Sequence, residues 1–220
     1  MTATPSNPGQ PLLIAVDGPA ASGKGTIARA LARHFGLPHM DTGLLYRSVA
    51  LSMFRFGGDP GNEFEAVRAV EGTAQVDPTD EELRSEVVGS IASRISAYPG
   101  VRAALLDRQR QFASQSEGAV LDGRDIGTVI APNATVKLYV TASPEVRARR
   151  RVAELLKRGM PAHLEDVLID IRARDARDSG RDNAPLVQAR DAILLDTSEM
   201  DIDEAVAEAI KLVEERLADA

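Results

Sequence analysis

The chain has 220 residues, 44% of them hydrophobic and 27% charged, with a formal net charge of −7 at pH 7. This composition is typical of a folded globular protein, and the negative charge argues against a general nucleic-acid binder. The absence of cysteine excludes disulfides, thiolate metal sites and cysteine nucleophiles. No apolar run is long enough for a membrane span, and residues 1–11 lack the features of a secretory signal. We therefore expect a flexible tail over 1–11 and a cytoplasmic protein without a membrane partner.

Short apolar runs predict β-strands, and the amphipathic segments between them predict helices. The five runs are Leu12–Val16, Leu37–Met40, Ala119–Leu121, Val136–Val140 and Ala192–Leu195. This alternation predicts an α/β fold with a five-stranded parallel sheet flanked by helices. Sheets of this kind bind ligands beyond the carboxyl ends of their strands.

Two helix starts can be placed from capping residues. Thr79, with Glu82 three residues later, predicts the start of a helix whose apolar face runs to Ile95. Ser143 followed by Pro144 predicts a second start, because proline is favoured at the first helical position.

The interval 56–118 holds no convincing strand, and Thr73–Val76 is its only candidate. We expect a mostly helical insert at about 58–97 between the core segments 12–57 and 98–220.

A glycine-rich segment follows the first predicted strand and precedes an amphipathic helix. Its residues are Gly18, Pro19, Ala20, Ala21, Ser22, Gly23, Lys24, Gly25 and Thr26. In such a loop, backbone amides and the helix N-terminus face a phosphate, and the lysine reaches the β- and γ-phosphates. We predict that the loop binds ATP. The common form of this motif has Ser or Thr directly after the lysine. Here Gly25 takes that place, so Thr26 is the candidate for the metal-binding hydroxyl.

Basic residues concentrate in one part of the chain. The segment from Arg147 to Arg181 has ten basic and six acidic residues, a local charge of +4, whereas the other 185 residues carry −11. Guanidinium groups match phosphate oxygens in pairs, so the segment predicts a small, strongly anionic ligand. The alternative is a set of solvated helix faces. No N-K-x-D sequence for guanine recognition is present, which argues against a GTPase. The arginine-rich segment instead favours phosphoryl transfer to a small acceptor under a short lid at about 147–163.

Five segments together resemble the bacterial cytidylate kinase family of nucleoside monophosphate kinases. They are GPAASGKGT at 18–26, DTGLLYR at 41–47, LDGRDIGTV at 121–129, RARRRVAELLKRG at 147–159 and RARDARDSGRDNAPL at 172–186. The resemblance implies a P-loop kinase core with a nucleotide-binding insert and a lid, and ATP- and Mg²⁺-dependent phosphorylation of CMP or dCMP in pyrimidine metabolism. Thr42 stands where the family usually has serine, and it keeps the hydroxyl. The stretch Glu71–Ser93 is too short for the small antiparallel sheet of longer members.

The resemblance also implies roles for single residues. The residues assigned to CMP are Thr42, Arg47, Ser93, Arg102, Arg124, Asp125, Arg174, Asp178 and Arg181. Those assigned to catalysis are Lys24, Arg124, Arg150, Arg151 and Arg158, and Arg147 is a further lid candidate to close over the ATP phosphates. Asp122, which ends a predicted strand beside the loop, is a candidate for indirect Mg²⁺ binding together with Thr26. A carboxylate can accept from the cytosine amino group, which suits Asp125 as a base reader.

Two other functions fit parts of the pattern. One is a different small-acceptor kinase, of the UMP, shikimate or gluconate type, and the other is a nucleotide-binding regulator without turnover. A pure binder needs only one set of arginines, whereas this chain has candidates for both donor and acceptor. The spacing of Arg174, Asp178 and Arg181 also fits a simple ion-pair ladder along a helix. With a self-contained core and no heptad repeat, we expect a monomer.

Overall fold

The computed structural model describes residues 11–219. The predicted tail over 1–11, apart from its last residue, lies outside the described residues. Contacts within the chain divide it into two compact units. The first consists of Met1–Met40 and Ala113–Ala220, and the second of Asp41–Phe112.

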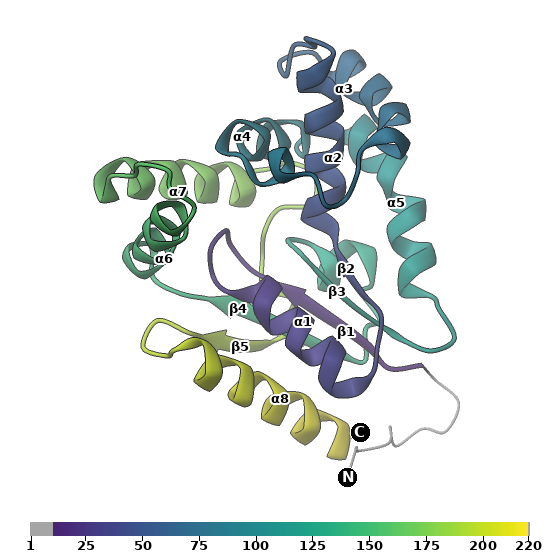
Figure 1. Cartoon of the computed structure of the whole chain (residues 1–220). Helices are drawn as coiled ribbons and strands as arrows, with labels where there is room; N and C mark the ends of the chain where they lie inside the picture. Colours follow the sequence, from purple (N-terminus) through teal and green to yellow (C-terminus); the bar gives the residue numbers. More distant parts are fainter. Residues whose placement is uncertain (1–10, 220) are drawn as a thin grey trace. The chain divides into compact units, whose positions relative to one another are not determined.

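The first unit is built on a five-stranded parallel sheet with the order β2-β3-β1-β4-β5 (Figure 1). The strands are β1 (Leu13–Asp17), β2 (His39–Asp41), β3 (Ala119–Gly123), β4 (Val136–Thr141) and β5 (Ile193–Asp196). All five predicted strands are therefore confirmed, with ends that differ by at most two residues. Buried β-strands in parallel sheets are apolar along their whole length, which explains why these runs could be recognised.

Helices α1 (Lys24–Phe35) and α8 (Ile202–Ala218) lie beside each other against the sheet (Figure 1). Their buried side chains, such as Leu31 and Val213, pack with Ile14 and Val16 of the central strand. Helices α6 (Pro144–Lys157) and α7 (Leu164–Ser179) pack against each other as a hairpin. Because β1 is central and α1 follows it directly, the segment that joins them is held at both ends by the most buried part of this unit.

The second unit is helical, as expected for an insert. It contains α2 (Thr42–Arg55), α3 (Glu63–Ala69), two 3₁₀ turns η1 (Glu71–Gln75) and η2 (Glu81–Arg84), α4 (Glu86–Ile95) and most of α5 (Pro99–Ala113). The structure describes every residue of this unit, and none between Thr42 and Phe112 lies in a strand. Leu51, Leu83 and Ile95 are fully buried in its own apolar core.

Two local predictions for this unit were wrong. The candidate strand Thr73–Val76 lies mostly in the 3₁₀ turn η1, where the Thr73 hydroxyl donates to the Val70 carbonyl. Thr79 does not cap a long helix, because its hydroxyl and its amide both donate to the Asp77 carboxylate. Helix α4 begins later, where the Ser85 hydroxyl accepts from the Val88 amide.

The predicted start of α6 at Ser143 is confirmed, with Pro144 as the first helical residue. In the described part of the chain, no helix has the length and the apolar character needed to cross a membrane.

Candidate active site

The glycine-rich segment forms a tight loop from the end of β1 into α1. Gly18 has φ of 153°, and a Cβ atom at this position would overlap the carbonyl oxygen of Val140 on β4. Gly23 adopts a left-handed conformation as the N-cap of α1, and its carbonyl accepts from the amides of Thr26 and Ile27 at 3.0 and 3.1 Å. Ala21 is also left-handed, with φ of 58°. The chain thus reaches the positive end of α1 with Lys24 as its first helical residue, so the helix starts inside the predicted loop segment and includes Gly25 and Thr26.

A carboxylate and a histidine lie beside this loop. Asp122, at the end of β3, is almost fully buried, and its Oδ1 accepts from Nε2 of His39 at 2.7 Å. Its Oδ2 faces the loop, since a Cβ atom built on Gly25 would lie 3.6 Å from it. The structure therefore brings Asp122 to the start of α1, where Thr26 is also found. His39 orients this carboxylate through the hydrogen bond.

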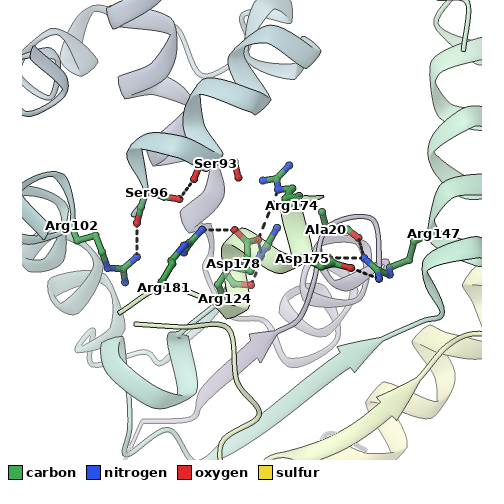
Figure 2. A network of polar contacts seen from close by, with 11 residues as sticks. Ala20, Ser93, Ser96, Arg102, Arg124, Arg147, Arg174, Asp175, Asp178 and Arg181 are labelled. Carbon is green, nitrogen blue, oxygen red and sulfur yellow. Dashed lines mark hydrogen bonds and ion pairs between the residues drawn. The ribbon is translucent and has the colours of Figure 1, made fainter. Parts of the chain in front are cut away.

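Three arginines surround one buried carboxylate at the end of α7 (Figure 2). Nε of Arg124 donates to Oδ2 of Asp178 at 2.8 Å, Arg181 donates to Oδ1, and Nε of Arg174 lies 3.9 Å from Oδ2. Asp178 is 1% exposed. Burial raises the pKa of Asp178, but the three guanidinium groups outweigh this effect and hold the pKa below its usual value. We call Arg124, Arg174, Asp178 and Arg181 the Asp178 cluster; it has two positive charges in excess of its carboxylate.

The segment after β3 is held by a second buried carboxylate. Oδ1 and Oδ2 of Asp17 accept from the amides of Ile126 and Gly127 at 2.9 and 2.7 Å. Asp125 lies directly before this contact, is 5% exposed, and leads into a π-helical turn at Ile126–Ile130. A turn of this kind is rare and often occurs at functional sites. Arg124 and Asp125 are thus presented by a segment that is fixed to the end of β1.

Four predicted site residues lie in the second unit. Thr42 is the first residue of α2 and is buried. Arg47 donates to the carbonyls of Leu83 and Ser85 at 2.7 and 3.4 Å. The guanidinium of Arg102 donates to the Ser96 carbonyl at 3.3 Å, and the Ser96 hydroxyl donates to the carbonyl of Ser93 at 3.0 Å (Figure 2).

The guanidinium of Arg102 also lies 6.0 Å from the centre of the Tyr46 ring, within the range of a cation–π contact. Tyr46 itself belongs to the apolar core of this unit.

The arginines of α6 differ in their surroundings. Arg150, which the resemblance assigns to catalysis, instead donates to the hydroxyl and the carbonyl of Thr197 at 2.9 and 2.6 Å and to the Met200 carbonyl at 3.0 Å. Burial lowers the pKa of its guanidinium. Arg151 pairs with Glu154 at 2.6 Å within the helix, and Arg158 is the C-cap residue of α6.

Some polar contacts near the loop were not predicted. Thr197 is buried, and its hydroxyl lies within 3.2 Å of the Ser22 carbonyl in the loop and 3.1 Å of the Thr141 carbonyl. Arg147, which we expected to close over the ATP phosphates, is buried and forms a second such contact with Asp175. Both join segments far apart in the sequence, so no local spacing could have indicated them.

A parallel sheet with a glycine-rich loop between β1 and α1, and an arginine cluster in the same unit, defines a protein of the P-loop kinase class. A protein-family model described as cytidylate kinase matches residues 14–215. The chain belongs to the cytidylate kinase family, whose members are ATP-dependent phosphotransferases.

Individual relatives agree with this assignment. The chain is 58% identical over 209 residues to a cytidylate kinase from Xanthobacter autotrophicus, with 94% of this chain and 99% of the relative covered. It is 56% identical over 205 residues to a cytidylate kinase from Azorhizobium caulinodans, covering 92% and 98% of the two chains. An uncharacterized protein from Eubacterium ventriosum, known from a crystal structure, shares the fold with a TM-score of 0.56 at 16% identity, covering 94% of this chain and 99% of that chain.

Proposed function

We propose that this protein transfers the γ-phosphoryl group of ATP to CMP or dCMP, and that the Asp178 cluster is part of the acceptor site. The observation that carries the acceptor assignment is the set of three guanidinium groups around one buried carboxylate. A cluster with two excess positive charges suits a nucleoside monophosphate, whose phosphate carries up to two negative charges. Asp178 can accept from the hydroxyl groups of a pentose while it keeps the arginines in place.

The donor site in this proposal is the loop from Gly18 to Thr26. Its backbone amides and Lys24 hold the ATP phosphates, and the α1 N-terminus contributes a partial positive charge. Phosphoryl transfer needs two phosphates held in line and a neutralised moving group, with little covalent help from the protein. Lys24, Arg124, Arg151 and Arg158 are the groups we assign to that neutralisation. Arg150 could join them only after it leaves the Thr197 carbonyl.

Recognition of cytosine follows from its hydrogen-bonding edge. Cytosine has an amino donor at C4 and acceptors at N3 and O2, so the site must offer an acceptor and two donors. We assign Asp125 to the amino group, Arg102 and Arg181 to the ring acceptors, and a supporting role to Thr42. Uracil would bring its O4 against a carboxylate, and a pair of buried acceptors is strongly unfavourable.

The remaining acceptor contacts follow the same chemistry. We assign Arg47 and Arg124 to the phosphate of CMP, because guanidinium groups bind phosphate oxygens in pairs. Arg174 and Asp178 bind the pentose hydroxyls, with Ser93 in support.

Magnesium is implied by the family, and the oxygen donors near the loop fit it. Mg²⁺ at kinase sites is held by one or two carboxylates, by water and by substrate phosphates. The buried Asp122 carboxylate faces Gly25 with one oxygen, and Thr26 offers a hydroxyl, so these two residues would hold the ion, directly or through water. When bound, the ion neutralises part of the charge on the β- and γ-phosphates.

The test is a panel of acceptors with ATP and Mg²⁺, followed by ADP release. We expect kcat/KM for CMP and dCMP to exceed that for UMP and AMP by at least tenfold, because the site leaves polar groups unpaired against the wrong base. Faster turnover of UMP or shikimate than of CMP would refute the assignment. Measurable binding of both nucleotides without any turnover would indicate a regulator instead.

A matched pair of variants at the C-terminal end of α7 and just beyond it tests the acceptor residues. Arg181→Ala should raise KM for CMP at least tenfold and change KM for ATP less than threefold. Arg177→Ala, which removes an exposed arginine from the last turn of α7, is the control and should change neither. Equal increases in both KM values for Arg181→Ala would contradict its place at the base.

A further inference from the structure

A single buried arginine touches both the phosphate loop and the helix that carries the acceptor cluster. Arg147 lies in the first turn of α6 and is 3% exposed. Its Nη1 and Nη2 donate to the two carboxylate oxygens of Asp175 at 3.0 and 2.6 Å (Figure 2). Its Nε donates to the Ala142 carbonyl at 2.8 Å, and Nη1 also donates to the Ala20 carbonyl at 3.2 Å. The guanidinium thus makes four contacts in one fixed plane.

The two ends of this contact belong to different substrates. Ala20 is part of the loop that we assign to ATP. Asp175 lies on α7 between Arg174 and Asp178, which we assign to the acceptor. Arg147 is therefore a hydrogen-bonding partner that the backbone of the donor loop and the acceptor-binding helix have in common.

The contact to Ala20 also affects the direction of the loop amides. The Ala20 carbonyl and the Ala21 amide belong to one planar trans peptide, so they point in opposite directions. Fixing the carbonyl on Arg147 therefore turns the Ala21 amide the other way. Ala21 has φ of 58°, which is unfavourable for alanine and persists only where the surroundings hold it. Arg147 supplies part of that support.

Stability alone is a weak reason for such an arrangement. A buried ion pair loses most of its Coulomb energy to desolvation, and apolar residues of the same size often stabilise a protein as well. An ion pair that joins two binding elements can fix the position of one element relative to the other, because its hydrogen bonds are directional at both ends. Apolar contacts do not have this directionality.

We propose that Arg147 and Asp175 are positioning residues that couple the ATP loop to the acceptor-binding helix. When ATP occupies the loop, it fixes the conformation of the loop backbone. Through Arg147 and Asp175 this also fixes α7 in the position that binds the acceptor. Binding of either substrate then strengthens binding of the other, by the same factor in both directions. This inference rests on the proposed function, which assigns the two sites.

The experiment measures the dissociation constant of CMP by calorimetry, with and without a saturating non-hydrolysable ATP analogue and Mg²⁺. For the unaltered protein we expect CMP to bind at least fivefold more tightly when the analogue is present. For Arg147→Met and for Asp175→Asn we expect this ratio to fall below twofold. The reverse titration, analogue with and without CMP, should give the same ratios.

A second ion pair between the same two helices provides a matched control. Arg172 on α7 and Glu145 on α6 lie 2.7 Å apart, but both are exposed. Arg172→Met should keep the full coupling ratio. A merely structural role for Arg147 would lower stability and leave the ratio intact in the folded variants.

The possible outcomes separate the inference from the proposed function. If the unaltered protein binds CMP and the analogue without coupling, or if Asp175→Asn keeps the ratio, the inference is refuted and the proposed function stands. If the unaltered protein binds no CMP under either condition, both are refuted. Should Arg147→Met fail to fold, Asp175→Asn decides, because it leaves Arg147 on its two carbonyl groups and replaces only a partly exposed carboxylate.

Discussion

Asp17 combines two opposing influences on a single carboxyl group. Burial raises the pKa of Asp17 to about 7, although the amides of Gly127 and Ile126 donate to it and favour the charged form. The nearby Asp125 raises the pKa further, whereas Lys24 lowers it. The two carboxyl oxygens of Asp17 accept from the amides of Ile126 and Gly127, in the segment that follows Arg124 and Asp125.

This raised pKa predicts how stability changes with pH. In the unfolded chain Asp17 ionises near pH 4, whereas in the folded protein it keeps its proton up to about pH 7. The folded state therefore binds the extra proton, and the free energy of unfolding falls as the pH rises through this window. We expect the free energy of unfolding of the unaltered protein to fall by roughly 1–3 kcal/mol between pH 5 and pH 8. In Asp17→Asn this fall should be absent, and urea unfolding of both proteins measures it.

A second carboxylate provides the control for that measurement. Asp191 accepts from Lys137, and this hydrogen bond lowers the pKa of Asp191. Its ionisation is complete below pH 5, so Asp191→Asn should leave the slope between pH 5 and pH 8 unchanged. The groups that act on Asp17 besides the backbone are Asp125, Lys24 and Tyr139. If Asp17→Asn and the unaltered protein have the same slope, the buried carboxyl is ionised at pH 5.

Lys24 offers a prediction for catalysis at the same scale. The Lys24→Met variant keeps a long, unbranched side chain that favours a helix, but it removes the positive charge at the start of α1. We expect kcat to fall at least 100-fold while the dissociation constant for CMP changes less than threefold, because only the donor phosphates lose a partner. A kcat within twofold of the unaltered value would show that the loop is not the donor site.

At the scale of single elements, the caps explain where several helices begin. Helix α8 has a full capping box: Asp201 accepts from the Glu204 amide at 2.8 Å, and Glu204 accepts from the Asp201 amide at 2.9 Å. We expect Asp201→Ala to lower the free energy of unfolding by about 1 kcal/mol, and Asp201→Ser by only a few tenths. Urea unfolding of both variants measures this. Equal losses for the two would show that the hydroxyl does not replace the carboxylate as a cap.

The phosphate loop depends on the close approach of two elements at Gly18. Gly18→Ala would push a methyl group into the Val140 carbonyl of β4, so we expect at least a tenfold loss of ATP affinity. Gly36→Ala is the comparison, because Gly36 is left-handed with φ of 67° but nothing lies within 4 Å of its Cβ position. It should cost about 1 kcal/mol of stability and leave ATP binding intact. Fluorescent-nucleotide titration and urea unfolding distinguish the two effects.

The sheet could be predicted from sequence because its strands are short apolar runs, and the three inner strands β1, β3 and β4 are largely buried. The phosphate loop was recognisable because glycines and lysine have fixed spacing between a strand and a helix. The start of α4 was misplaced for a specific reason: Thr79 bonds to Asp77 in its own turn, and a 3₁₀ turn intervenes before Ser85 caps the helix.

Long-range polar partners were beyond the reach of sequence patterns. Arg150 and Arg147 are neighbours on α6 and look alike in the sequence. One bonds to the Thr197 loop, and the other bonds to Asp175, 28 residues away along the chain. Their different partners follow from helix packing, which a periodic pattern does not encode.

At the scale of the whole molecule, two apolar cores support two units. Ile95 is fully buried in the helical unit, and Leu31 in the unit with the sheet. We expect Ile95→Ala to lower the free energy of local opening by about 2–5 kcal/mol in α2 and α4, measured by amide hydrogen exchange. Strands β1 and β4 should keep their protection in this variant and lose it in Leu31→Ala. Equal loss of protection in both units after Ile95→Ala would mean that they open only together.

The contact between Arg147 and Ala20 has a consequence for how related proteins diverge. Arg147 meets the loop through a main-chain oxygen, so the identity of residue 20 can drift without breaking that bond. Its other partner is a side chain. Loss of the charge at position 147 therefore leaves Asp175 without its ion-pair partner, and loss of the charge at position 175 leaves Arg147 as a buried cation without one. Across many lineages, positions 147 and 175 should therefore be exchanged as a pair, while position 20 varies independently of both.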